Sequence, residues 1–224
     1  LIGLGYYDNH MPKVIQRHVL ENPRWYTSYT PYQAEIAQGR LEALFNFQTI
    51  VCELTGFPVA NASLLDEGTA AAEAMTMAFK INKNAKNNFC IQNTCHPQTL
   101  SILKTRAKPL GIKIIFDKPD ENTFACLIQN PDTFGEIADL SNLIKMNKEK
   151  AIISIVAADI MSLVIMKPPR DFGAEIVIGS SQRFGISLGF GGPHAAYFAT
   201  INEYQRLIPG RLIGVSIDRN NKRS

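Results

Sequence analysis

The sequence predicts a three-layer α/β/α fold, in which helices cover both faces of a mainly parallel sheet. From residue 89 onward, short apolar runs alternate with helical segments, as in domains built from strand–helix–strand units. These runs are apolar throughout instead of alternating with polar residues, which indicates strands that are buried on both faces. The chain has 224 residues, of which 46% are hydrophobic, enough for a large core.

The first third of the sequence predicts an arm followed by the start of the main domain. Residues 13–21 have apolar side chains at helical spacing, which predicts a short helix that ends at Asn22-Pro23. Four aromatic residues and a proline follow within 25–33 without a helical or strand period, which predicts an extended loop. We therefore expect residues 1–33 to form an N-terminal helix and aromatic arm, and residues 34–224 to form one large domain.

The predicted large domain begins with a long helix from Ala34 that stops before Gly56 and Pro58. Residues 59–65 are predicted as a connector, and an alanine-rich helix begins near Gly68-Thr69. The elements predicted after it are strand 89–92, helix 97–110, strand 112–116, strand 125–129, helix 137–148, strand 151–157 and strand 176–178.

The composition and charge of the chain argue against several classes of partner. The net charge of +3 is small and the basic residues are scattered, so neither nucleic acid nor an anionic membrane is expected as a partner. The longest apolar run, 152–165, is too short and too polar to span a bilayer, which takes about 20 residues. The 4 cysteines show no zinc-ligand spacing, so we expect reduced thiols, no metal site and a cytoplasmic protein. The chain opens on apolar residues without Met, which suggests a piece of something longer.

Candidate ligand-binding residues follow the apolar runs, because ligands of open parallel sheets bind at the carboxyl ends of the strands. Gly68 and Thr69 open a helix whose N–H groups could hold a phosphate, although taken alone they are explained better as an ordinary helix cap. His96 lies in a turn, where an imidazole could stack on a flat ring or simply be a polar loop residue. Asp159 ends a buried run, so it either meets a cation such as a protonated ring nitrogen or caps the next turn.

Residues 179–196 are the fourth candidate, because 5 glycines and a proline crowd behind an apolar run. Glycine lets the backbone pass close to a ligand or to another backbone. The polar residues of this stretch include Ser180, Ser181, Gln182, Arg183 and His194. Together the four candidates have the order of a pyridoxal-phosphate site in fold type I: a phosphate-binding helix start, a stacking residue, a carboxylate for the ring nitrogen and a turn with a Schiff-base lysine. Only the lysine is absent.

Several segments, in order, resemble the N-terminal half of the glycine cleavage system P-protein family. They are YTPYQAE at 29–35, QGRLEAL at 38–44, NASLLDEGTAAAEA at 61–74, CHPQT at 95–99, GSSQRFG at 179–185 and GGPHA at 191–195. The resemblance runs from Gly3 to Gly214. It implies a fold type I, aminotransferase-like large domain that lacks its C-terminal small domain. Family members have two related halves, in one chain or as two subunits, and the cofactor lysine lies in the other half.

The resemblance also implies roles for single residues. Gln182 stands where the sister half has its lysine, and a carboxamide cannot form an imine, so the partner half would hold pyridoxal phosphate covalently. This copy of the site is then a degenerate cofactor pocket, formed by Gly68, Thr69, His96, Asp159, Gln182 and His194.

A second group of residues resembles the part of the family that reaches the working site between the halves. These candidates are Tyr29, Thr30, Pro31, Tyr32 and, more weakly, Arg211. Two phenol groups on a proline-stiffened loop could orient glycine. The alternative interpretation is that the aromatic rings only fill the interface between the halves.

The resemblance implies a reaction in which glycine is decarboxylated with pyridoxal phosphate and its aminomethyl group passes to the lipoyl arm of H-protein. This chain would complete the substrate site and hold the lysine-bearing half or subunit 2, and it would be inactive alone. Two other classes stay open. A self-sufficient pyridoxal enzyme needs a lysine just after strand 176–178, whereas Lys167 and Lys222 are misplaced. A non-catalytic scaffold or regulatory subunit would have only the degenerate pocket.

Overall fold

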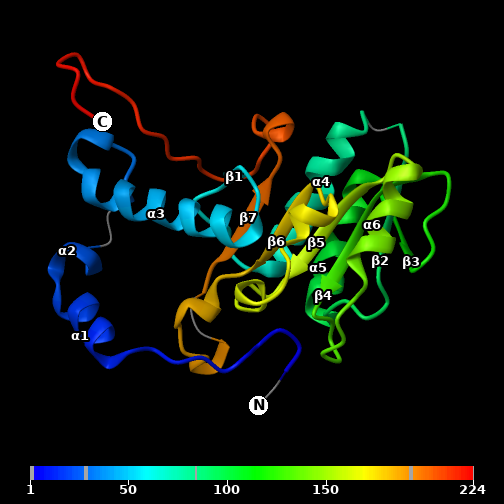
Figure 1. The fold of residues 1–224 in the computed structure, drawn as a ribbon, viewed down its shortest axis with the longest axis horizontal. Helices are drawn as coiled ribbons and strands as arrows, with labels where there is room; N and C mark the ends of the chain where they lie inside the picture. Colours follow the sequence, from blue (N-terminus) through cyan, green and yellow to red (C-terminus); the bar gives the residue numbers. More distant parts are fainter. Residues whose placement is uncertain (1–2, 28–29, 84, 192–193, 224) are drawn as a thin grey trace.

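The computed structural model describes residues 3–27, 30–83, 85–191 and 194–223, in which a seven-stranded sheet lies between two layers of helices (Figure 1). The order across the sheet is β1-β7-β6-β5-β4-β2-β3. The strands are β1 (Val59–Ala60), β2 (Asn88–Ile91), β3 (Lys113–Phe116), β4 (Thr123–Asn130), β5 (Ile153–Ala158), β6 (Ile176–Ser180) and β7 (Ala196–Thr200). Strands β3, β2, β4, β5 and β6 are parallel, and β7 is antiparallel to both β6 and β1. The predicted mainly parallel sheet is confirmed.

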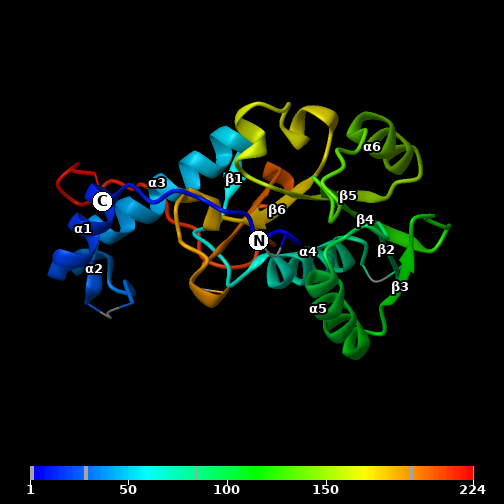
Figure 2. The ribbon, with the colours of Figure 1, turned by 90° about the horizontal axis from the view of Figure 1, so that it is seen from below.

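The α-helices are α1 (Lys13–Glu21), α2 (Pro23–Tyr26), α3 (Gln38–Thr55), α4 (Glu67–Ile81), α5 (Pro97–Ala107) and α6 (Leu140–Glu149). Short 3-10 turns are η1 (Ala34–Ile36), η2 (Lys108–Leu110), η3 (Ser162–Val164), η4 (Pro169–Phe172), η5 (Gln182–Phe184), η6 (Gly189–Gly191) and η7 (Asn202–Tyr204). Helices α4 and α5 pack on one face of the sheet, and α3 and α6 pack on the other (Figure 2). No helix in the described part of the chain is long and apolar enough to cross a membrane.

Two large apolar clusters form most of the core, one on each face of the sheet. Along β5, Ile155 and Ala157 belong to the cluster under α4 and α5, whereas Val156 and Ala158 belong to the cluster under α3 and α6. Successive residues of a strand point to opposite faces, so a strand that is buried on both faces must be apolar at every position. The alanines of α4 are fully buried and let this helix lie close to the sheet.

The order in which strands are added to the sheet reverses between β2 and β4, and this reversal affects the carboxyl edge. From β2 the chain crosses to β3 on one side, and from β4 it crosses to β5 on the other. Such a switch point leaves a crevice outside the strand ends. Because β7 is antiparallel, its first residue pairs with the last residue of β6, Ala196 with Ser180. The residues just before β7 therefore lie at the same edge as those that follow β6.

The structure differs from the sequence prediction in the arm. Residues 25 and 26 belong to helix α2 and not to an extended loop. Asn22 accepts a hydrogen bond from the Arg24 N–H at 3.1 Å, and Pro23 occupies the first helical position, where its fixed φ favours a helix. The Asn-Pro pair thus ends α1 and also starts α2.

Several elements of the large domain also differ: α5 ends at Ala107 instead of residue 110, and α6 begins at Leu140 instead of residue 137. Helix α3 begins at Gln38 instead of Ala34, because Ala37 has the non-helical φ of −125° and residues 34–36 form a separate turn. The predicted connector 59–65 contains strand β1, which closes one edge of the sheet. Strand β7 was not predicted at all, since the glycine-rich stretch before it obscures the apolar run 196–199. The division into arm and domain stays a prediction.

Candidate functional site

Helix α4 starts at the carboxyl edge with a conventional cap. The Asp66 carboxylate accepts a hydrogen bond from the Thr69 N–H at 2.7 Å. Gly68 is buried and packs against Ile102 of α5. Capping and helix packing therefore account for Gly68 and Thr69, and a phosphate-binding role for them stays a prediction.

His96 follows β2 and occupies the position before α5. Its side chain is buried, and Nδ1 lies 3.0 Å from the hydroxyl of Thr133, which follows β4. Burial lowers the pKa of His96, so the neutral imidazole is favoured. A cavity of about 270 Å³ adjoins His96 and is also lined by Gly68, Ser180 and His194. Three of the six predicted pocket residues thus meet in one cavity.

Asp159 shows both of the interactions that its position predicts. Its carboxylate accepts a hydrogen bond from the Met161 N–H at 3.4 Å, as the cap of a turn does. It also lies 3.2 Å from Nε of Arg183, and both side chains are mostly buried. The cation that faces this carboxylate is therefore a guanidinium of the same chain.

The side chain of Gln182 forms a hydrogen bond within its own turn. Its buried side-chain amide donates to the Ile186 carbonyl at 2.8 Å. The Gln182 carbonyl accepts a hydrogen bond from the side chain of Asn9 at 3.2 Å. The carboxamide thus stabilises the 182–186 turn and does not line the cavity that adjoins His96.

The close packing around residue 179 explains why the glycine-rich stretch begins with glycine. A Cβ at this position would overlap the Ala158 carbonyl oxygen on β5 and would lie 2.6 Å from the ring of Tyr197 on β7. The Tyr197 hydroxyl donates to the same Ala158 carbonyl at 2.6 Å. Of the two interpretations of these glycines, close approach to another backbone holds at this position.

The sequence interpretation missed Glu67 and Gln129, which both line the pocket. The side-chain amide of Gln129 donates to the Glu67 carboxylate at 3.2 Å. Burial raises the pKa of Glu67 to about 7, while the hydrogen bond from Gln129 opposes this shift. Gln129 ends an apolar run, so the rule that found Asp159 could have found it too. Glu67 has only the weaker signal of a second acid beside a helix cap.

The structure does not place the second group of candidates at this pocket. Thr30, Pro31 and Tyr32 connect α2 to η1, and the Tyr32 side chain is 78% exposed. Tyr29 lies outside the described residues. Arg211 is half-buried, and its carbonyl accepts a hydrogen bond from the Ala62 N–H at 2.7 Å. The roles of these residues stay predictions.

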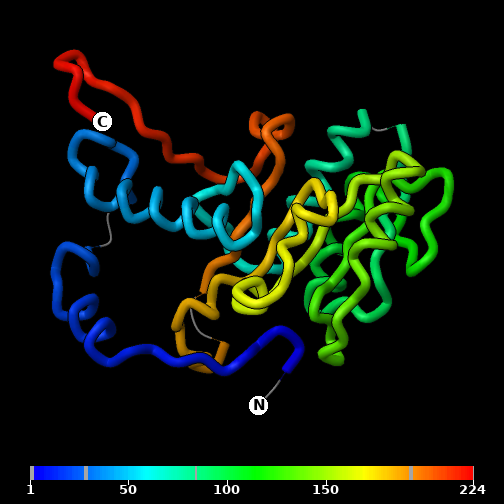
Figure 3. The backbone as a smooth tube through the Cα atoms, viewed as in Figure 1, coloured from blue at the N-terminus to red at the C-terminus, as the bar shows by residue number. Residues whose placement is uncertain are grey.

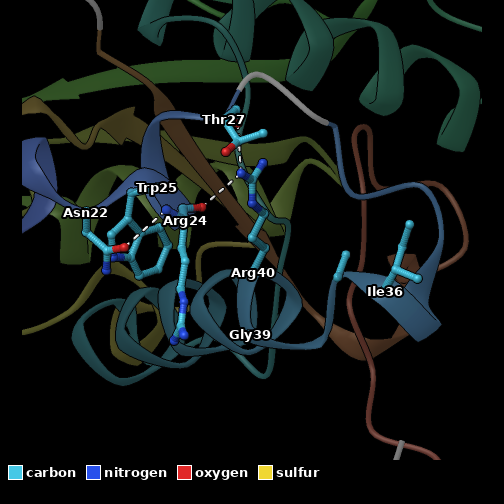
Figure 4. A pocket seen from close by; sticks show the side chains of 8 residues that line it. Asn22, Arg24, Trp25, Thr27, Ile36, Gly39 and Arg40 are labelled. Carbon is cyan, nitrogen blue, oxygen red and sulfur yellow. Dashed lines mark hydrogen bonds between the residues drawn. The ribbon is translucent and has the colours of Figure 1, made fainter.

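A separate cavity of about 640 Å³ lies between the arm and the start of α3 (Figure 4). Trp25 and Ile36 give it apolar walls. On one side, the Arg40 guanidinium donates to the carbonyls of Arg24 at 2.9 Å and of Thr27 at 2.8 Å. Arg40 thereby ties the end of α2 to the first turn of α3.

The space between His96 and Asp159 does not fit the ring of pyridoxal phosphate, although the adjoining cavity of about 270 Å³ beside Gly68 stays open. The space bounded by Gly5, His96, Asp159 and Arg183 has a volume of about 10 Å³, room for about one water molecule. The carboxylate already faces a guanidinium, and Gln182 cannot form an imine. Within the described ranges, no group of three or more His, Cys, Asp and Glu side chains could hold a metal ion.

Comparison with known proteins gives consistent matches along the whole chain. Residues 1–224 match the family described as Glycine cleavage system P-protein. The chain is 56% identical to "Glycine dehydrogenase (decarboxylating)" of Nostoc punctiforme over 227 aligned residues, which cover 99% of this chain and 23% of that protein. It is 53% identical to the mitochondrial "Glycine dehydrogenase (decarboxylating) A" of Flaveria pringlei, covering 99% of this chain and 22% of that protein. The chain thus spans about a quarter of the length of these relatives.

Solved structures agree with the sequence relatives. A "glycine decarboxylase (P-protein) of the glycine cleavage system, in inhibitor-bound form" is 32% identical with a TM-score of 0.93, covering 99% of this chain and 52% of that one. A cystathionine gamma-lyase from Lactobacillus plantarum is 16% identical with a TM-score of 0.61, covering 81% of this chain and 51% of that one, and shows only that the fold is shared. Because the family model matches its entire length, the chain belongs to the glycine cleavage system P-protein family.

Proposed function

We propose that this chain is part of the half of a glycine decarboxylase that lacks the cofactor lysine. Buried Gln182 is the observation that carries this assignment, because it occupies the turn after β6 where the resemblance places the lysine of the sister half. Relatives named glycine dehydrogenase (decarboxylating) are about four times as long as this chain, which supports a larger protein that supplies the missing parts.

The complete protein is proposed to bind glycine, to decarboxylate it and to transfer the aminomethyl group to the lipoyl arm of H-protein. Pyridoxal phosphate, held by the lysine-bearing half, would supply the electron sink that decarboxylation of an amino acid requires. The misfit of this cofactor in the present chain supports its assignment to the other half.

The contribution proposed for this chain is the loop between α2 and η1. A tyrosine that is 78% exposed, Tyr32, is available to a partner and contributes little to the core of its own chain. Hydroxyl groups on a loop stiffened by Pro31 can orient a small amino acid or its carboxylate at low entropic cost. Arg211 is the weaker candidate for contact with that carboxylate.

The test is glycine turnover by the full-length protein, measured as exchange of the glycine carboxyl group with bicarbonate. We expect Tyr29→Phe and Tyr32→Phe to lower kcat/KM by about tenfold or more, since each removes a hydroxyl that orients substrate. Tyr26→Phe is the matched control, because Tyr26 is an exposed tyrosine of the same arm.

Unchanged turnover in both loop variants would instead favour a scaffold half with a degenerate pocket. The closed space between His96 and Asp159 supports this second candidate, because a purely structural half has no need of an open site. In either case the chain without its lysine-bearing half is expected to be inactive.

A further inference from the structure

The N-terminal residues 3–10, here called the leading segment, lie across the carboxyl edge of the sheet before the chain enters α1 (Figure 3). They are held by hydrogen bonds from Gln98 to the Leu4 carbonyl at 2.5 Å, from Arg183 to the Asp8 carbonyl at 2.6 Å, and from Asn9 to the carbonyls of Gln182 at 3.2 Å and Ile186 at 2.8 Å. Helix α5 and the turn after β6 thus hold the segment at both of its ends.

The middle of the leading segment occupies the space in front of His96. Gly5 has a φ of +87°, and a Cβ on it would lie 2.8 Å from Nε2 of His96. A side chain is excluded there by both conformation and contact. The backbone of the segment therefore lies directly against the imidazole, where a stacked ligand ring would otherwise lie.

Arg183 closes the opposite side of the same space. Its guanidinium lies 3.2 Å from the Asp159 carboxylate, and its Cζ lies 5.0 Å from the ring centre of Tyr7 in the leading segment. A mostly buried carboxylate needs a cation, and a guanidinium can satisfy it while it also packs on an aromatic face. The charge at this site is thus balanced from within the chain.

We propose that the pocket at the carboxyl edge is a docking site for the leading segment of this same chain, with Arg183 as the cation for Asp159. Three observations converge on this assignment: the hydrogen bonds at both ends of the segment, the Gly5 contact with His96, and a residual space of about 10 Å³. Docking excludes a pyridine ring from this half. It also fixes the point from which the chain enters α1 and the arm.

Hydrogen exchange of the full-length protein, followed by mass spectrometry, tests the docking. In Arg183→Met the amides of residues 4–10 should exchange about tenfold faster or more, because the contacts with Asp159, Tyr7 and the Asp8 carbonyl are lost. Gly5→Ala should release the same residues from the other side of the contact. Arg106→Met, which breaks the ion pair of Arg106 with Glu73 at 2.6 Å on α5 and α4, should leave them unchanged. Equal protection of residues 4–10 in all variants would overturn the proposal.

A second measurement asks whether the docked segment, and not merely the missing lysine, keeps the cofactor out. Gln182→Lys in the full-length protein is treated with pyridoxal phosphate, reduced with borohydride and digested. We expect no phosphopyridoxyl group on the peptide that carries position 182, and we expect its appearance only when Arg183→Met and Gly5→Ala are added. Labelling of Gln182→Lys alone would overturn the proposal. Because neither readout depends on glycine turnover, the docking and the proposed function can fail separately.

Discussion

The carboxyl edge of the sheet and the N-terminal arm are built in opposite ways. At the edge, mostly buried polar groups pair with one another: Asp159 with Arg183, and Glu67 with Gln129. The space between His96 and Asp159 is about 10 Å³, and a cavity of about 270 Å³ adjoins it beside Gly68. In the arm, no residue of α1 or α2 is buried, and a cavity of about 640 Å³ stays open between Trp25 and the start of α3.

This difference shows which region is complete without a partner. Buried polar groups are costly unless they are paired, and the edge meets that condition from within the chain. Exposed apolar side chains gather in the arm, namely Val14, Ile15, Val19, Leu20, Trp25, Tyr26 and Tyr32. An apolar surface of this kind is typical of a contact that is made elsewhere. The polar groups of the degenerate pocket are thus satisfied within the chain, whereas the exposed apolar side chains of the arm are available to a partner.

The largest expected effect is on the packing behind the pocket. Gly179→Ala should lower the free energy of unfolding by about 3 kcal/mol. The added Cβ would overlap the Ala158 carbonyl and the Tyr197 ring, and tightly packed neighbours cannot move to make room for it. Urea unfolding of the full-length protein measures it. Gly214→Ala, where a Cβ meets nothing within 4 Å, is the control and should be nearly neutral. Equal effects at both positions would mean that the edge is not tightly packed.

The next effect is a pH dependence that comes from Glu67. Burial raises its pKa from 4.5 to about 7, so the folded state binds this proton more tightly than the unfolded chain does. The group therefore costs no stability below its unfolded pKa, and its cost grows as the pH rises to about 7. Between about pH 5 and about pH 8, wild type should lose about 2 kcal/mol more stability than Glu67→Gln, as measured by urea unfolding at each pH. Parallel pH profiles would show that Glu67 is not buried as described.

A smaller effect is expected when the ion pair of the pocket is broken. Asp159→Ala should cost about 1.5 kcal/mol, because it leaves the mostly buried Arg183 without its carboxylate. The control is Glu73→Ala, whose partner Arg106 is 46% exposed, so that about 0.5 kcal/mol or less is expected. Thermal or urea unfolding compares the two. A cost at Glu73 that matches that at Asp159 would remove the contrast between a buried pair and a surface pair.

The smallest effect on global stability is expected in the arm. Arg40→Met removes the bonds to the carbonyls of Arg24 and Thr27, yet it should change the free energy of unfolding by less than about 0.5 kcal/mol. Hydrogen exchange in α2 should nevertheless become faster, because that contact is local. Arg17→Met, which breaks an exposed pair with Glu21 in α1, should not alter α2. A large loss of global stability would show that the arm and the domain fold as one unit.

The periodicity of the sequence predicts most of the sheet and its covering helices. The buried strands β4 and β5 are recognisable because a strand buried on both faces is mainly apolar, and helix α4 is recognisable because its alanines favour a helix. Strand β7 was missed, because its pairing with β6 and β1 is long-range and the glycines before it give no strand signal. Helix α2 was missed because a proline that ends one helix can also begin the next.

Within the site, local sequence determined the residue types, whereas only tertiary structure determined what each of them contacts. Gln182 excludes an imine in any fold, and Asp159 at the end of a buried run is expected to meet a cation or to cap the next turn. The sequence does not specify that the cation is Arg183, nor that Gly5 lies against His96, because these contacts join segments far apart in the chain. The order of residues along the chain predicts a cofactor-like pocket. Only the packing of the leading segment across the edge of the sheet fills the space between His96 and Asp159.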